Sequence, residues 1–170
     1  MPKNKDYLRY LFLLSLVAFH VAADQISKHL VREKVDLYEN ISLIKNHFTL
    51  TKVENTGAFL SLGDQLPGFV RLALLSLLPI GVLAFGLFYL FSHRELHLRM
   101  QLALSCLIGG GIGNVYDRLR FGSVTDFLHI DFGLFRTGVF NLADVSIMTG
   151  IGLLLLHNFL APKAQEVPAA

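Results

Sequence analysis

The sequence from Val139 to Leu160, VFNLADVSIMTGIGLLLLHNFL, is apolar almost throughout and contains one acidic residue, Asp144. The hydrocarbon core of a bilayer is about 30 Å thick, and a helix needs about 20 mostly apolar residues to cross it. This stretch is long enough, so it predicts a transmembrane helix. An ionisable side chain at membrane depth costs at least about 2.5 kcal/mol. Asp144, close to one end of the span, is therefore a candidate functional residue.

Three other stretches match this one in length and apolar character. The 170 residues are 53% hydrophobic and 16% charged, with a mean hydropathy of +0.52, which is too apolar for a soluble domain of this size. We therefore predict an all-α membrane protein, with a single integral-membrane domain over residues 1–170. Pro79 is expected to kink the second span. The four transmembrane helices are expected at about residues 7–26, 69–91, 98–116 and 139–160.

The first span also has features of a cleavable signal peptide. Lys3, Lys5 and Arg9 precede an apolar run that ends Val21-Ala22-Ala23. Cleavage there would leave an odd number of spans and would separate Asp24 from them, so we favour a retained helix. The same positive charges, together with arginines between the second and third spans, predict cytoplasmic termini.

Several other classes of site lack support in the sequence. Lys and Arg residues are scattered, which argues against a nucleic-acid partner, and the single cysteine, Cys106, allows no internal disulfide. The glycine-rich run from Gly109 to Gly113 has no Lys-Ser/Thr pair after it, so its small-xxx-small spacing predicts helix packing rather than a phosphate loop. His93 and His97 show no metalloprotease pattern. We expect no metal and no cofactor.

Between the first two spans the pattern changes to that of a strand. His47-Phe48-Thr49-Leu50-Thr51 alternates polar with apolar residues, as in a half-buried sheet. Gly57, Gly63 and Pro67-Gly68 then mark turns before the second span. We predict a small β-region at about residues 40–62 on the outer surface.

Asp126 is the second candidate acid. It lies in Ser123-Val124-Thr125-Asp126-Phe127-Leu128, which is apolar enough to return to the membrane surface, and a turn before Asp144 would bring the two carboxyls together. Two carboxyls in a poorly hydrated site share one proton near neutral pH. This is the equipment of an aspartic protease. The alternative is an ion pair with Arg118 or Arg136, or a helix cap.

Other polar residues border the apolar segments and have two interpretations each. Asp117-Arg118 and Asp24 stand at ends of spans, where charges commonly anchor a helix to the interface. Three asparagines could donate hydrogen bonds to a substrate backbone, or could cap helices. They are Asn55, Asn114 and Asn141.

Five blocks in this order and spacing resemble bacterial lipoprotein signal peptidase, the signal peptidase II family, and they cover most of the chain. They are Asp24-Gln25-Ile26-Ser27-Lys28, Asn55-Thr56-Gly57-Ala58, Gly113-Asn114-Val115-Tyr116-Asp117-Arg118, Gly122-Ser123-Val124-Thr125-Asp126-Phe127 and Phe140-Asn141-Leu142-Ala143-Asp144.

The resemblance implies a multi-pass aspartic peptidase of the bacterial inner membrane, with four helices, cytoplasmic termini, and a β-cradle and short surface helix at the outer face. Such enzymes cut before a diacylglyceryl-modified cysteine, and globomycin inhibits them. The implied catalytic residues are Asp126 and Asp144, near the outer face. The implied supporting residues are Asp24, Asn55, Asn114, Asp117, Arg118 and Asn141, and a loop that carries Gly57 is expected to close over the site.

The chain departs from the family pattern at one place. Phe59-Leu60-Ser61 stands where the family usually has Ala-Phe-Ser, which changes the wall of the outer loop and bears on substrate preference and inhibitor fit. The expected partners are lipid-modified prolipoproteins, membrane lipids and globomycin-type inhibitors, and we expect a monomer. Two other functions remain open. They are a proton-coupled membrane transporter, which would use the same buried carboxyls, and a non-enzymatic assembly factor built on Gly109 and Gly113.

Overall fold

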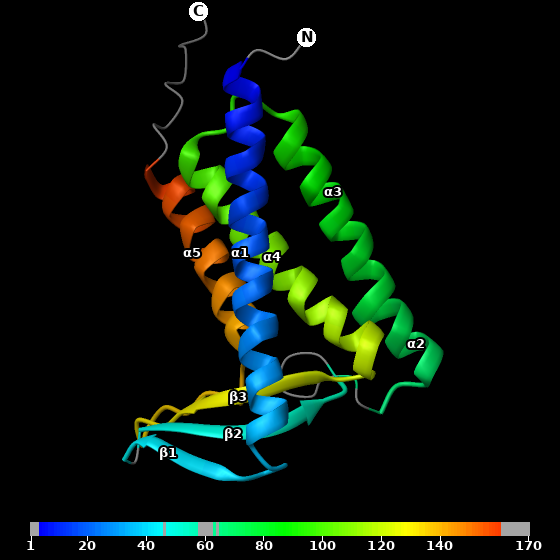
Figure 1. The fold of residues 1–170 in the computed structure, drawn as a ribbon, viewed down its shortest axis with the longest axis vertical. Helices are drawn as coiled ribbons and strands as arrows, with labels where there is room; N and C mark the ends of the chain where they lie inside the picture. Colours follow the sequence, from blue (N-terminus) through cyan, green and yellow to red (C-terminus); the bar gives the residue numbers. More distant parts are fainter. Residues whose placement is uncertain (1–3, 46, 58–62, 64, 161–170) are drawn as a thin grey trace, which may run out of the picture.

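A computed structural model describes residues 4–45, 47–57, 63 and 65–160. The long helices lie side by side, and a small sheet crosses one end of them (Figure 1). The first turn of α1 and the last turn of α5 lie at the opposite end. The elements are α1 (Asn4–Lys34), β1 (Asn40–Ile44), β2 (Phe48–Asn55), α2 (Gly68–Leu72), η2 (Ala73–Leu77), α3 (Leu78–Ser92), α4 (Leu98–Phe121), β3 (Val124–Ile130) and α5 (Leu142–Leu160).

Three helical stretches of the described residues are long and apolar enough to cross a membrane. They are Asp6–Lys34, Gly68–Ser92 and Leu142–Leu160. The predicted span at 7–26 falls inside α1, which continues about two turns further to Lys34. That extension carries the charged end of the helix across to the sheet.

The stretch from Gly68 to Ser92 runs through α2, η2 and α3 without a break. Its expected irregularity at Pro79 takes the form of a π-helical turn, Ala73–Leu77, which ends two residues before the proline. Proline lacks an N–H and clashes with the carbonyl four residues earlier, here that of Leu75, so the regular α-helical ladder cannot pass through this position.

Helix α4 is as long as a span but less apolar, because charged residues gather at its ends: Arg99, Asp117, Arg118 and Arg120. Its middle is the most deeply buried helical segment of the described chain. Ile108 of α4 packs with Leu13 and Val17 of α1 and with Leu90 of α3 in the main apolar core.

Small residues on α4 allow α1 and α5 to approach closely, as the glycine spacing predicted. A Cβ atom added to Gly109 would meet His20 and Val17 of α1, and one added to Gly113 would meet the carboxyl of Asp24. A Cβ atom added to Gly110 would meet the Ala143 carbonyl of α5. The packing prediction is confirmed, and α4 is the helix between the other two.

The sheet has three antiparallel strands in the order β1-β2-β3. The β-region predicted at 40–62 contains β1 and β2, and its residues 58–62 lie outside the described part of the chain, including the Phe59-Leu60-Ser61 departure. The third strand was not predicted. It follows α4 and pairs with β2, with Val53 opposite Asp126. Among the described residues there is no separate surface helix.

Candidate active site

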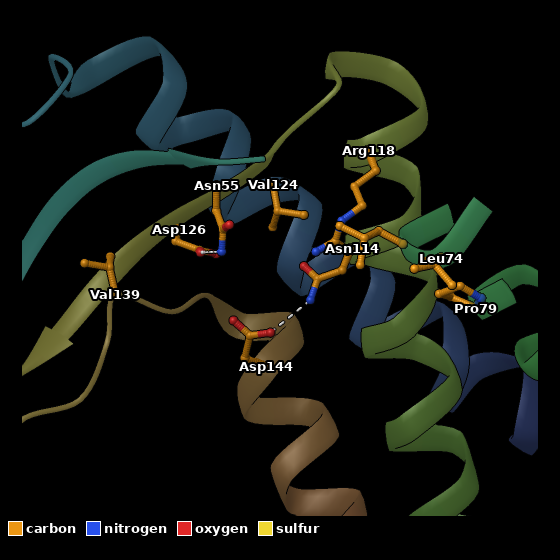
Figure 2. A pocket seen from close by; sticks show the side chains of 10 residues that line it. Asn55, Leu74, Pro79, Asn114, Arg118, Val124, Asp126, Val139 and Asp144 are labelled. Atoms are coloured by element: carbon orange, nitrogen blue, oxygen red, sulfur yellow. Dashed lines mark hydrogen bonds between the residues drawn. The ribbon is translucent and has the colours of Figure 1, made fainter. Parts of the chain in front are cut away.

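The two candidate acids come from different elements and line the same cavity. Asp126 lies on β3 at the edge of the sheet nearest the helices, and Asp144 lies in the first turn of α5. Figure 2 shows both side chains directed into one space between β3, α4 and α5. The cavity measures about 220 Å³, and its other polar lining residues are Asn55, Asn114 and Arg118. The expected proximity of the two carboxyls is therefore observed.

Asp126 is held by two side-chain amides. Asn55 donates to its Oδ2 at 3.0 Å, and Asn141 donates to its Oδ1 at 2.6 Å. The Asn55 amide cannot turn over, because its own oxygen accepts the backbone N–H of Gly57 at 3.0 Å. Both carboxyl oxygens of Asp126 are therefore met by donors of fixed orientation.

Asp144 forms a reciprocal cap with Asn141 at the start of α5. The Asn141 side-chain oxygen accepts the Asp144 backbone N–H at 3.0 Å, and the Asp144 Oδ2 accepts the Asn141 backbone N–H at 3.1 Å. This is the arrangement of a capping box. The remaining oxygen, Oδ1, accepts from the Asn114 amide at 2.9 Å. Asp144 is thus both a helix cap and a cavity residue, and the two interpretations are compatible.

The amide of Asn141 also connects the two acids. Its nitrogen donates to Asp126 and, at 3.1 Å, to the side-chain oxygen of Asn114, whose own nitrogen reaches Asp144. Two asparagines therefore link the carboxyls into one hydrogen-bonded chain. Such a chain fixes both rotamers before any substrate arrives.

The electrostatic environments of the two acids differ. The Asp126 side chain is almost fully buried, whereas Asp144 is half-buried. Burial raises the pKa of Asp126 from its usual 3.8 to about 6, and the charge of Asp144 adds to the rise, while the hydrogen bond from Asn55 opposes it. Burial therefore favours the protonated form of Asp126.

A buried charge cluster supports the site from behind. The ammonium of Lys28, fully buried, lies 2.8 Å from Asp24 and 3.1 Å from Asp117, which are also fully buried. Arg32 contacts Asp117 at 2.8 Å. Asp24 and Asp117 do not anchor a helix at an exposed interface, as one interpretation of the sequence had it. Their carboxylates compensate the charges of Lys28 and Arg32, which would otherwise have no partner of opposite charge.

The cluster reaches the acids through Asn114. Lys28 donates to the Asn114 side-chain oxygen at 2.9 Å, which forces the amide nitrogen toward Asp144. Asp24 contributes separately by accepting the backbone N–H of Ala143, the residue before Asp144, at 2.9 Å. The charges of α1 therefore set the position of a carboxyl on α5.

The ion-pair alternative for the two acids holds only as a longer-range attraction, in which the charge of Arg118 acts on both Asp126 and Asp144 without direct contact. Arg118 donates to the Gly57 carbonyl at 2.8 Å, and Arg136 pairs with Asp131 at 2.8 Å. Within the described residues neither arginine forms a salt bridge with Asp126 or Asp144. Arg118 nevertheless lines the cavity and ties α4 to the loop that carries Gly57.

Sequence reasoning missed four polar residues of this network, which are Lys28, Arg32, Gln25 and Thr125. Lys28 stood inside a recognised block but was not selected, because a lysine four residues after an aspartate is a common exposed helix pair. Gln25 bridges Asp24 and Asp117 at 3.0 and 3.1 Å, and Thr125 donates its backbone N–H to Asp117 at 3.2 Å. The i, i+4 spacing of Asp24 and Lys28 at the end of an apolar span indicates that the two side chains can pair, but it does not indicate that they are buried.

Comparison with known proteins identifies the family. The model of the family described as signal peptidase II matches residues 16–160, most of the chain. The chain belongs to the signal peptidase II family. A lipoprotein signal peptidase from Streptococcus pyogenes serotype M1 is 40% identical over 147 residues, covering 86% of this chain and 91% of the relative. One from Psychromonas ingrahamii is 31% identical over 164 residues, covering 96% and 92%.

Two solved structures share the fold of this chain. One bacterial membrane enzyme superposes with a TM-score of 0.78 at 26% identity, covering 92% of this chain and 94% of the other. A second superposes with a TM-score of 0.77 at 23% identity, which shows the fold alone. The chain is a peptidase with the helical fold of a membrane enzyme, and the cavity with its two acids lies within the matched region.

Proposed function

We propose that this chain is a membrane-embedded aspartic endopeptidase that removes the signal peptide from diacylglyceryl-modified prolipoproteins, cutting before the lipidated cysteine. The observation that carries the proposal is the pair Asp126 and Asp144, brought from two elements into one cavity in a chain of the signal peptidase II family. The relatives in that family are named lipoprotein signal peptidases, which supplies the substrate class.

In the proposed mechanism the pair carries one proton, on Asp126. The half-buried Asp144 takes a proton from a water molecule, and the oxygen of that water attacks the scissile carbonyl carbon. At the same time Asp126 gives its proton to the carbonyl oxygen. When the resulting tetrahedral diol collapses, the C–N bond breaks and the proton on Asp144 passes to the leaving amine. The remaining hydroxyl returns a proton to Asp126, so the pair ends as it began.

The arrangement in the membrane follows from the same fold. We propose that α1, α3, α4 and α5 all cross the bacterial inner membrane, with the sheet and the cavity at the outer face and the termini in the cytoplasm. A site at that depth meets a substrate anchored in the same bilayer. Globomycin-type peptides would inhibit by occupying the cavity, and no second chain is needed to complete it, in keeping with a monomer.

The proposal is tested with purified protein and a lipid-modified prolipoprotein. Asp126→Asn and Asp144→Asn keep the side-chain shape and remove the acid, so each is expected to lower kcat by at least about 10²-fold. Asp36→Asn, at an exposed position outside the cavity, serves as the matched control and should cleave like the parent. Full cleavage by either of the first two variants would refute the proposed dyad.

A further inference from the structure

A second cavity also has Asp144 in its wall, but not Asn55. It measures about 890 Å³ and is formed between the segment from Phe135 to Phe140 and the first half of α5. We call it the α5 groove. From Asp144 to Thr149 it follows the helix for about 7.5 Å. Its lining residues are Phe135, Arg136, Thr137, Gly138, Phe140, Asp144, Val145, Met148 and Thr149.

The groove is apolar in character even where its residues are not. Thr149 donates its hydroxyl to the Val145 carbonyl at 2.8 Å, and the Thr137 hydroxyl accepts the Ile130 backbone N–H at 3.0 Å. Both hydroxyls are therefore engaged with the backbone. Met148 is 65% exposed on a helix apolar enough to span a membrane, so the groove opens sideways toward lipid hydrocarbon.

The outer wall of the groove is a hairpin with an apolar tip. Asp131 and Arg136 close its base at 2.8 Å, and Gly133 adopts a left-handed conformation at φ +81°. Phe132 and Leu134 at its tip are exposed, as is Phe135. Exposed apolar side chains at the tip of this hairpin favour contact with a bilayer rather than with water.

We propose that the α5 groove binds the diacylglyceryl group of the substrate, and this inference rests on the proposed function. The lipidated cysteine is the residue directly after the scissile bond, so its lipid is tethered within one side chain of the two acids. It needs an apolar surface that begins at those acids. The α5 groove begins at Asp144 and leads into the hydrocarbon, which meets that requirement.

The contribution of the groove is to position the substrate rather than to raise its affinity. A lipid chain is as well solvated by bilayer hydrocarbon as by Val145 and Met148, so moving it into the groove gains little free energy. Holding the chain fixes the cysteine, and with it the scissile carbonyl, against Asp144. A misplacement of about 1 Å can cost about 10²-fold in rate. We therefore expect a change in the groove to alter kcat/KM.

The test compares two substrates with one peptide and different lipids, a dipalmitoyl and a dibutanoyl diacylglyceryl form. Met148→Trp fills the lower part of the groove. We expect it to lower kcat/KM by about tenfold or more for the long-chain substrate. The short-chain substrate extends less far past Met148 and should lose less than about threefold. Met148→Phe, a smaller obstruction at the same exposed position, should give the same order of effects with less amplitude.

Leu155→Trp is the matched control, because Leu155 is 52% exposed on α5 but outside the groove. It should leave both substrates unaffected. An equal loss for both substrates in Met148→Trp would show that the groove holds peptide, and no loss for either would show that it holds bulk lipid only; both results overturn the inference. Failure of the proposed function is distinguishable, since the parent protein would then cleave neither substrate.

Discussion

Asn55 is a residue whose side chain adjusts the acidity of another. Its amide nitrogen reaches Asp126 at 3.0 Å and is kept there by the Gly57 N–H on its oxygen. A fixed N–H donor favours the ionised carboxyl, whereas burial favours the protonated one. The balance leaves the pKa of Asp126 at about 6. The proton that the proposed mechanism assigns to Asp126 is therefore present below that pH and lost above it.

This balance predicts the pH dependence of cleavage. In the free enzyme, a rise of pH through about 6 removes the proton from Asp126, so kcat/KM should fall as pH rises through that range. The profile of kcat should turn down at a higher pH, because bound peptide and lipid desolvate Asp126 further. Rates measured at saturating and at low substrate between pH 4 and 9, on the order of one point per half unit, check both curves.

The Asn55→Ala variant distinguishes titration of Asp126 from a general effect of pH on the protein. Without the amide donor the ionised form of Asp126 loses stabilisation, so the inflection in kcat/KM should move to higher pH. Asn40→Ala removes an exposed asparagine of β1 whose amide donates to the Tyr38 carbonyl, and it should leave the inflection in place. An inflection that moves to lower pH in Asn55→Ala would contradict the assignment of the proton.

Single residues also show where prediction from sequence ends. Asp126 and Asp144 could be selected because a carboxyl at membrane depth is costly and needs a reason. Lys28 could not, since an aspartate and a lysine four residues apart at the end of a span are compatible with full exposure. Only the folded chain brings Asp117 of α4 against them and buries all three charges. That burial is a tertiary property that no local pattern contains.

At the scale of elements, α4 and α5 meet where Gly110 faces the Ala143 carbonyl, one residue before Asp144. Gly110→Ala puts a methyl group against backbone and against Ile147, which cannot move aside cheaply. We expect a loss of about 1–3 kcal/mol in stability, seen as a lower Tm, since overpacked cores cost that much. We also expect a lower kcat, because the start of α5 carries Asp144.

Gly152→Ala is the matched control on α5, since an added Cβ there meets nothing within 4 Å. Alanine is favoured over glycine in a helix by up to about 1 kcal/mol, so Tm should stay the same or rise slightly. Equal changes in Tm for the two variants would mean that close approach of α4 and α5 is not what Gly110 provides.

The elements differ in how far their sequences predict them. Long apolar runs predicted the helices, and alternation at residues 47–51 predicted a strand at β2. Strand β3 has no alternation, because Val124, Thr125, Asp126 and Phe127 are all buried, with β2 on one side and helices on the others. A strand buried on both faces loses the period of two on which prediction depends.

At the scale of the whole molecule, the sheet constrains the path of the chain through the membrane. Strands β2 and β3 pair directly, although α3 and α4 lie between them in the sequence. A chain that leaves the sheet and crosses the bilayer along α3 must cross back before it can form β3. Helix α4 is less apolar than the other three predicted spans, because its ends are charged, but the pairing of β2 with β3 supports four crossings.

This topology predicts which positions a membrane-impermeant maleimide can reach. Arg120→Cys, at an exposed position near the end of α4 that lies against the sheet, should be labelled in intact spheroplasts. Glu95→Cys, exposed between α3 and α4, should be labelled only after permeabilisation. The native Cys106 is buried and should contribute little background. If α4 did not cross, both positions would lie on one side of the membrane and would label together. Strands β2 and β3 would then lie on opposite sides of the membrane and could not pair.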